Sequence, residues 1–142
     1  MGLRGNPVDA YKQTRVRTAS QGRVIVMLYD EAIRQLDVAG QALAEGAHSY
    51  DRVNAAVSKT QQIITELMVS LDFDKGGAFA QNLLNLYMFF NRELTEANLK
   101  KKPEPIAKVR SFLAELRDAW DQAERTSSYD GSAGSSGINI AG

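Results

Sequence analysis

Apolar residues recur along most of this sequence at spacings of three and four, and no proline interrupts residues 8–102. Such spacing is typical of amphipathic helices and occurs in four stretches, whereas the alternation typical of strands is nowhere convincing. Short connections between four helices favour antiparallel neighbours. The predicted fold class is therefore all-α, an antiparallel up-down four-helix bundle. We expect a short N-terminal arm at 1–17, the bundle at 18–125 and a disordered, serine- and glycine-rich C-terminal tail at 126–142.

Local signals set the expected helix boundaries. Ser20 is a suitable N-cap for the first helix, and Gly46 marks its end. Ser49 or Asp51 opens the second helix, and the segment DFDKGG at 72–77 separates it from the third. The four expected helices cover about 21–45, 51–71, 78–101 and 103–125.

Composition excludes several classes of partner. Seventeen basic residues balance seventeen acidic ones, so no basic field attracts nucleic acid or anionic lipid. The apolar run NLLNLYMFF at 82–90 is too short for membrane insertion, which takes about 20 apolar residues. The chain has no cysteine, and its first residues lack the apolar core of a signal peptide. We therefore expect a cytoplasmic protein.

Residue patterns that support catalysis or metal binding are incomplete in this sequence. Glu45 and His48 match half of a di-iron motif, which needs a second histidine that the chain lacks. Segment 72–77 imitates the start of a calcium loop, but Leu83 stands where the bidentate carboxylate belongs. No glycine-rich phosphate loop occurs. We expect no metal, no cofactor and no enzymatic activity.

Two of the expected helices carry more apolar residues than one buried face needs. With about 100° per residue, the inward stripes of the first and third helices are Ile25, Leu28, Tyr29, Ala32, Leu36, Ala39 and Leu43, and Phe79, Leu83, Leu86, Tyr87, Phe90, Leu94 and Ala97. The apolar residues outside these stripes are Val24, Val26 and Met27, and Leu84, Met88 and Phe89. Burial is worth about 1.5–3 kcal/mol for each large side chain, so three left in water forgo roughly 5–9 kcal/mol. Such a cluster usually marks an interaction surface.

Two interpretations of this surplus stay open. The N-terminal arm can cover it, because Val8, Tyr11 and Val16 are apolar. Alternatively, an external partner competes with the arm for the same surface and fills a groove with apolar side chains from a helix.

Three blocks of the sequence carry a family signature. The first block is Tyr11, Thr14 and Thr18-Ala19-Ser20, followed by Met27-Leu28-Tyr29-Asp30 and Ala32-Ile33. The other two blocks are Leu86-Tyr87, Leu94 and Ala97-Asn98, and Leu113, Leu116-Arg117 and Trp120. In this order they resemble the flagellin-specific export chaperones of the FliS family, over about residues 6–125. Gln21 and Glu31 depart from the proline and glycine that the family usually has there.

The resemblance implies a chaperone of the bacterial cytosol that binds the disordered C-terminal segment of flagellin. It would prevent premature polymerisation and aid delivery to the flagellar type III export apparatus, whose components are a second implied partner. In this family the arm is thought to lie over part of the same surface when no flagellin is bound. Motif matches and the helical wheel together predict partner-binding roles for Tyr11, Val16, Val24, Met27, Leu28, Tyr29, Leu84, Tyr87, Met88 and Phe89. For Tyr29 and Tyr87, a place in the core with a hydrogen-bonded hydroxyl is as compatible with the sequence as a binding role.

An alternative function is a self-associating structural helical bundle, or an adaptor without a flagellin client. In that case the same apolar patches pair between copies of the chain. Light scattering with and without a flagellin C-terminal peptide distinguishes the two.

Overall fold

The computed structural model describes residues 20–129, so the predicted arm at 1–17 and most of the predicted tail lie outside the described residues. The described chain forms α2 (Gln21–Glu45), the short 3-10 helix η1 (Ala47–Ser49), α3 (Tyr50–Val69), α4 (Phe73–Lys100) and α5 (Pro103–Tyr129). The last helix thus continues past its expected end near residue 125.

Local capping signals account for the helix ends. The Ser20 side chain accepts a hydrogen bond from the Arg23 amide at 3.1 Å, as expected for an N-cap. Gly46 ends α2 with a φ of 110°, a backbone conformation that side chains disfavour. Segment 72–77 is not a simple break. Asp72 caps a first turn of α4, and Gly77, with a φ of 52° and a ψ of −124°, kinks the helix after that turn.

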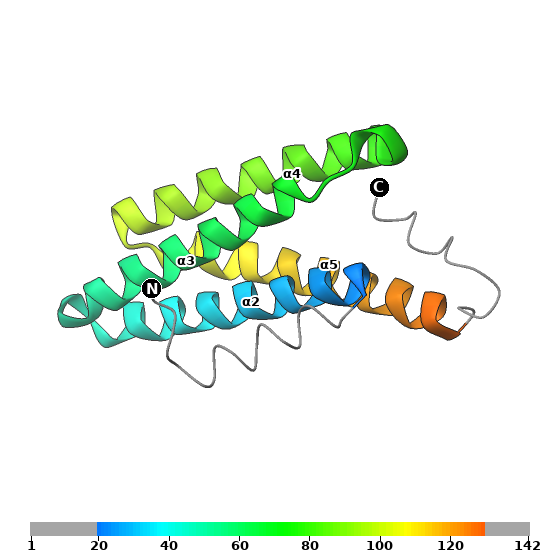
Figure 1. Ribbon diagram of the computed structural model, residues 1–142. Coiled ribbons are helices and arrows are strands. Elements are labelled where there is room, and N and C mark those ends of the chain that lie inside the picture. Colours follow the sequence, from blue (N-terminus) through cyan, green and yellow to red (C-terminus); the bar gives the residue numbers. More distant parts are fainter. Residues whose placement is uncertain (1–19, 130–142) are drawn as a thin grey trace, which may run out of the picture.

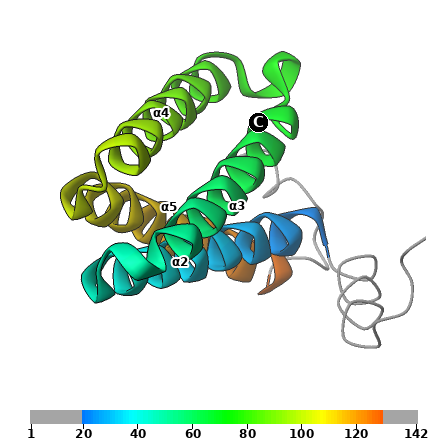
Figure 2. The same cartoon turned by 90° about the vertical axis from the view of Figure 1, so that its left-hand side faces the viewer.

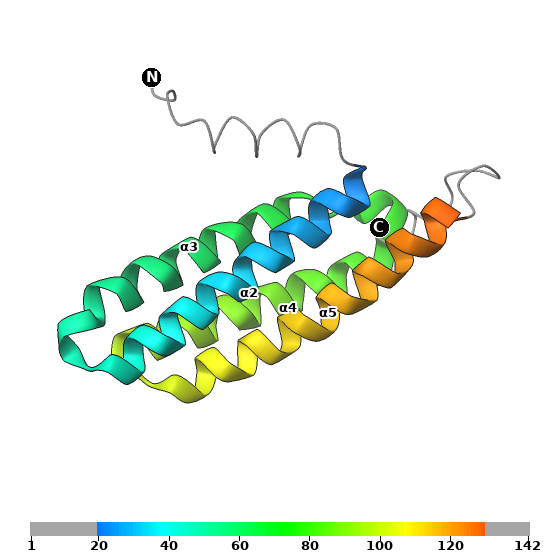
Figure 3. The ribbon, with the colours of Figure 1, turned by 90° about the horizontal axis from the view of Figure 1, so that it is seen from below.

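The helices form an antiparallel four-helix bundle, which confirms the predicted fold class. Around the bundle the order is α2, α3, α4 and α5, because α2 packs against α3 and α5 and α4 packs against the same two helices. Helices α2 and α4 are therefore diagonal neighbours, without an extensive contact between them in the described structure (Figures 1 and 3).

The core contains most residues of the predicted stripes, with two clear corrections. Val26, which the wheel placed outside the inward stripe, is fully buried. Phe79, which the wheel placed inside, is 44% exposed. Leu28, Leu43 and Leu86 are half-buried at the edges of the core.

A ladder of ion pairs joins α2 to α5 and explains the burial of Val26. Arg23, Asp30 and Asp37 follow one another every seven residues on α2, so they share one flank. They pair with α5 through Asp121 at 3.0 Å, Arg117 at 2.7 Å and Arg110 at 2.9 Å, respectively. Because α5 lies against this flank, the buried arc of α2 extends beyond the predicted stripe.

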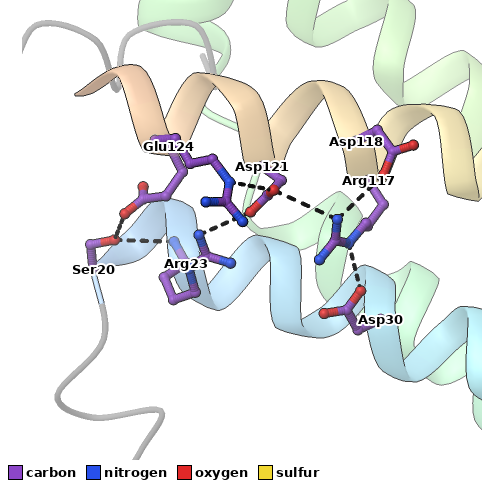
Figure 4. A network of polar contacts seen from close by, with 8 residues as sticks. Ser20, Arg23, Asp30, Arg117, Asp118, Asp121 and Glu124 are labelled. Carbon is purple, nitrogen blue, oxygen red and sulfur yellow. Dashed lines mark hydrogen bonds and ion pairs between the residues drawn. The ribbon is translucent and has the colours of Figure 1, made fainter. Parts of the chain in front are cut away.

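Figure 4 shows the end of this ladder, where Asp121 is shared by three guanidinium groups. Arg125, Arg23 and Arg117 lie 2.8, 3.0 and 3.7 Å from its carboxylate. The hydrogen bond from Arg125, followed by the one from Arg23, lowers the pKa of Asp121. Asp121 therefore stays ionised at the junction of the two helices.

The start of α2 lies directly against α5. Ser20 donates a hydrogen bond to Glu124 Oε2 at 2.6 Å. A Cβ at Gly22 would collide with the other oxygen of that carboxylate, so any larger residue there would displace the Glu124 side chain. This contact fixes the point at which the preceding chain enters the bundle.

Helix α4 is held firmly at its C-terminal end. Lys101, in the left-handed conformation with a φ of 52°, ends the helix. Its Nζ donates to Asn54 Oδ1 of α3 and to the Asn98 carbonyl, both at 2.6 Å, and lies 5.4 Å from the centre of the Tyr50 ring. These contacts tie the α4–α5 connection to α3.

Toward its N-terminal end, α4 diverges from α5 (Figures 1 and 2). Near the other end the two helices touch, with Lys108 3.2 Å from Glu93 and the Phe90 and Phe112 rings 5.8 Å apart. Phe79 lies beyond these contacts, in the part where the helices have separated. This divergence explains why a residue on the inward face of α4 is exposed.

We predict that Asp121→Asn lowers the free energy of unfolding by roughly 1–3 kcal/mol, because three arginines lose a shared, largely buried charged acceptor. Asp118→Asn is the matched control. Asp118 also pairs with Arg117, at 3.3 Å, but its side chain is 76% exposed, and removing such a pair costs less than about 1 kcal/mol. Urea unfolding followed by circular dichroism measures both variants. Equal losses would contradict a special role for Asp121.

Candidate functional site

The acidic residues that imitated metal ligands have structural roles. Glu45 accepts hydrogen bonds from Ser49 at 2.8 Å and Arg52 at 2.7 Å, which lower its pKa in that order. Asp72 caps α4 by accepting from the Lys75 amide at 3.1 Å. Within residues 20–129 no three metal-ligating side chains gather at one place. In the same part of the chain every helix is too short or too polar to span a bilayer.

Three predicted binding residues form a small apolar surface on α2, which we call the α2 patch: Val24, Met27 and Leu28. All three are half-buried, and their spacing of three and four places them on one side of the helix. Leu28 lies two residues, about 200°, from Asp30 on the flank that faces α5. The patch therefore extends from the outer side of α2 toward α3.

Two further predicted residues form the α4 patch: Leu84, which is half-buried, and Met88, which is 45% exposed. Asn91 and Thr95 continue the same flank at helical spacing. Both accept hydrogen bonds from Gln61 of α3, at 3.1 and 2.9 Å. The α4 patch thus borders α3 from the side opposite to the α2 patch.

Phe89, also predicted as a binding residue, lies on the other flank of α4. It packs against the core, with its ring 6.2 Å from the Phe90 ring and 5.8 Å from Lys108 Nζ of α5. The structure therefore does not gather the predicted surface residues into one groove. It separates them into patches on diagonal helices. Tyr11 and Val16 lie outside the described residues.

A third apolar surface, where α4 and α5 diverge, was largely missed by the sequence reasoning. We call it the α4–α5 wedge, and its residues are Phe79, Leu86, Phe89, Phe112 and Leu116. Phe79 and Leu86 share a flank of α4 with Glu93, which pairs with α5. Phe79 and Phe112 are 44% and 39% exposed, and the other three are half-buried. The position of Phe89 outside the predicted inward stripe is the sequence signal that points to this surface, and Phe112 is a further apolar residue on the neighbouring helix.

Tyr29 and Tyr87 occupy the core and not a surface. Both are almost fully buried, and their hydroxyls are hydrogen-bonded at 2.5 Å across the diagonal between α2 and α4. The Trp120 side chain of α5 lies near the Tyr29 hydroxyl and acts to lower its pKa. Burial raises the pKa of Tyr87 to about 12, against an opposing effect of its hydrogen bond to Tyr29. Burial, then the charge of Tyr87, raises the pKa of Tyr29 still further.

Comparison with known proteins identifies the family of this bundle. The family model described as "Flagellar protein FliS" matches residues 4–127. The chain belongs to the FliS family. It is 32% identical over 133 residues to the flagellar secretion chaperone FliS of Bacillus subtilis, covering 94% of this chain and 96% of that protein. It is 34% identical over 127 residues to the protein of the same name from Salmonella typhimurium, covering 86% of this chain and 93% of that protein.

Membership of the FliS family confirms the resemblance drawn from the three sequence blocks, and assigns the chain to the chaperones of flagellar secretion. In the structure the three blocks contact one another. Tyr29 and Asp30 of the first block meet Tyr87 of the second block and Arg117 and Trp120 of the third. The FliS signature therefore describes largely how the bundle is held together.

We predict that Tyr29→Phe destabilises this FliS-family bundle more than Tyr87→Phe does. Loss of the Tyr29 hydroxyl leaves the buried Tyr87 hydroxyl without its partner, at a cost of roughly 1–3 kcal/mol, and also removes the polar neighbour of Trp120. Loss of the Tyr87 hydroxyl leaves the Tyr29 hydroxyl beside Trp120. The double variant should cost less than the sum of the single changes, since the lost bond is shared. Urea unfolding of the three variants measures this coupling, and strictly additive losses would contradict it.

The same pair predicts a loss of stability at alkaline pH. In the folded chain both tyrosines hold their protons more tightly than in the unfolded chain, where their pKa is about 10. This contribution is complete below about pH 10 and declines toward about pH 12, by up to about 1.4 kcal/mol per pH unit and tyrosine. Thermal unfolding between about pH 9 and pH 11.5 measures the decline. An equally steep decline in Tyr29→Phe/Tyr87→Phe would show that other groups cause it.

Proposed function

We propose that this chain is a cytoplasmic export chaperone that binds the disordered C-terminal segment of flagellin. Binding would prevent premature polymerisation and aid delivery of flagellin to the flagellar type III export apparatus. Its relatives are named flagellar secretion chaperones, which supports the general role. The observation that carries the binding site is Met88, which is 45% exposed beside Leu84 on a helix whose inward face is already filled.

The geometry favours an extended client over one compact helix in one groove. The α2 patch and the α4 patch lie on either side of α3, whose outer face between them carries exposed polar residues such as Lys59, Gln62 and Glu66. One client segment that touches both patches has to cross this face. A segment without fixed structure can do so, because it adapts its path to a large surface.

Binding a disordered client requires enough apolar burial to offset the entropy that the client loses, and two separated patches can supply it. A disordered client loses conformational entropy when it binds, so its gross interaction energy has to exceed this cost. Apolar burial of Met27, Leu84 and Met88 would contribute to that energy at both ends of the client's path. Phe89 would then contribute through the flank that faces α5. Tyr11 and Val16 stay predicted as binding residues of the arm.

We predict that Met27→Asp and Met88→Asp each weaken the binding of a flagellin C-terminal peptide about tenfold or more, since a charge replaces apolar contact at a partner surface. Isothermal titration calorimetry with the full chain measures the affinity. Leu99→Asp is the matched control, because Leu99 is 77% exposed on α4 but belongs to neither patch.

The proposal fails if the peptide binds both patch variants as tightly as the unchanged chain. It also fails if light scattering finds a stable dimer that the peptide leaves unaltered, since the patches would then serve self-association. Circular dichroism of each variant shows that the helices are intact.

A further inference from the structure

The α4–α5 wedge is an apolar surface separate from the α2 patch and the α4 patch, and Phe89 is its one residue with a proposed role in client binding. Phe79, Leu86 and Phe89 line it from α4, and Phe112 and Leu116 line it from α5. Phe79 and Phe112 are each more than a third exposed along this surface, and exposed aromatic rings are costly to keep in water. An apolar segment that enters the wedge would cover them.

The position of the wedge points to the chain that follows α5. Phe90 lies level with Phe112, so the antiparallel register places Phe79 about level with Ala123. Helix α5 ends at Tyr129, roughly 9 Å further along its axis. The C-terminal end of α5, from which residues 130–142 continue, therefore lies at the same end of the bundle as the N-terminal part of α4 (Figures 1 and 2).

The sequence that follows α5 combines a spacer of small residues with a short apolar segment that could enter the wedge. Residues 131–137 read GSAGSSG, a spacer without bulky side chains, and residues 138–141 read INIA. From Tyr129 to Ile138 the chain can span at most about 30 Å, which allows it to turn back to Phe79. In an extended segment Ile138 and Ile140 point to the same side, and Asn139 points to the other.

Charge and topology disfavour the N-terminal arm as the occupant. The arm carries Arg4, Asp9, Lys12, Arg15 and Arg17, whereas residues 131–142 include no charged side chain, and neither do the residues that line the wedge. The arm also joins the bundle at α2, which contacts a different flank of α5 from the one that faces α4. Segment 131–142 instead follows a helix that forms one wall of the wedge.

We propose that Ile138 and Ile140 dock into the α4–α5 wedge of the free chain and shield the Phe79 ring. The tether makes this an intramolecular event with an effective concentration of about millimolar, so two aliphatic side chains suffice for substantial occupancy. The docked segment protects the open end of the bundle from contact with other copies. This inference does not depend on flagellin, since it concerns the chain alone.

A spin label tests the proposal cleanly because the sequence contains no cysteine. Asn139→Cys, labelled with a nitroxide, places the probe on the side of the segment that faces away from the wedge. We expect the backbone amide signals of Phe79, Leu86 and Leu116 to lose more than half their intensity. The signals of Met27 and Leu99, on the α2 patch and at the far end of α4, should keep theirs.

The control is the same labelled chain carrying Ile138→Asp and Ile140→Asp, in which the tether remains and the apolar contact is lost. Broadening of the wedge signals should largely disappear in this variant, with the circular dichroism spectrum unchanged. Broadening that persists, or that centres on the α2 or α4 patch, overturns the proposal. So does broadening of an isotope-labelled chain by a separate spin-labelled chain, because the contact would then lie between copies.

Discussion

Two diagonal helices of the bundle, α2 and α4, are joined in its core by a pair of tyrosine hydroxyls. The bond between Tyr29 and Tyr87 is short and buried, and Trp120 adds α5 to the same cluster. A buried hydroxyl without a partner is costly, so this bond is satisfied in one arrangement of the helices and lost in most others. It therefore fixes the position of α4 relative to α2 and α5.

Around this cluster, α2 and α5 are in contact along their length, whereas α4 separates from α5 toward one end and leaves apolar side chains exposed. Helices α2 and α5 are joined by a ladder of three ion pairs and by the close approach at Gly22. Helix α4 is anchored near Lys101 but diverges from α5 toward the kink at Gly77. A firmly packed pair of helices thus supports a third whose flanks keep apolar residues exposed. Most of the exposed large apolar side chains in the described part of the chain therefore lie on α4.

Helix boundaries could be predicted because the residues that set them act locally. Whether a side chain is buried or exposed depends on where the neighbouring helices lie. Ser20 and Gly46 act through their own backbone and side chains, so their roles follow from the sequence. The helical-wheel prediction gives every helix one buried stripe of the same width. Val26 is buried because α5 widens the covered arc, and Phe79 is exposed because α5 moves away. The separation of the predicted binding residues onto diagonal helices also required the structure.

Family motifs and partner surfaces are different kinds of information in this protein. The motif residues Tyr29, Asp30, Tyr87, Arg117 and Trp120 contact one another across three helices. Their presence indicates a bundle assembled as in the FliS relatives, and it says little about which surface a partner touches. Exposure gives that second kind of information, since an apolar side chain such as Met88 has no comparable structural role. Changes at these five residues should therefore act on folding, whereas changes at the patches, which include Met27 and Leu28 of the first block, should act on affinity.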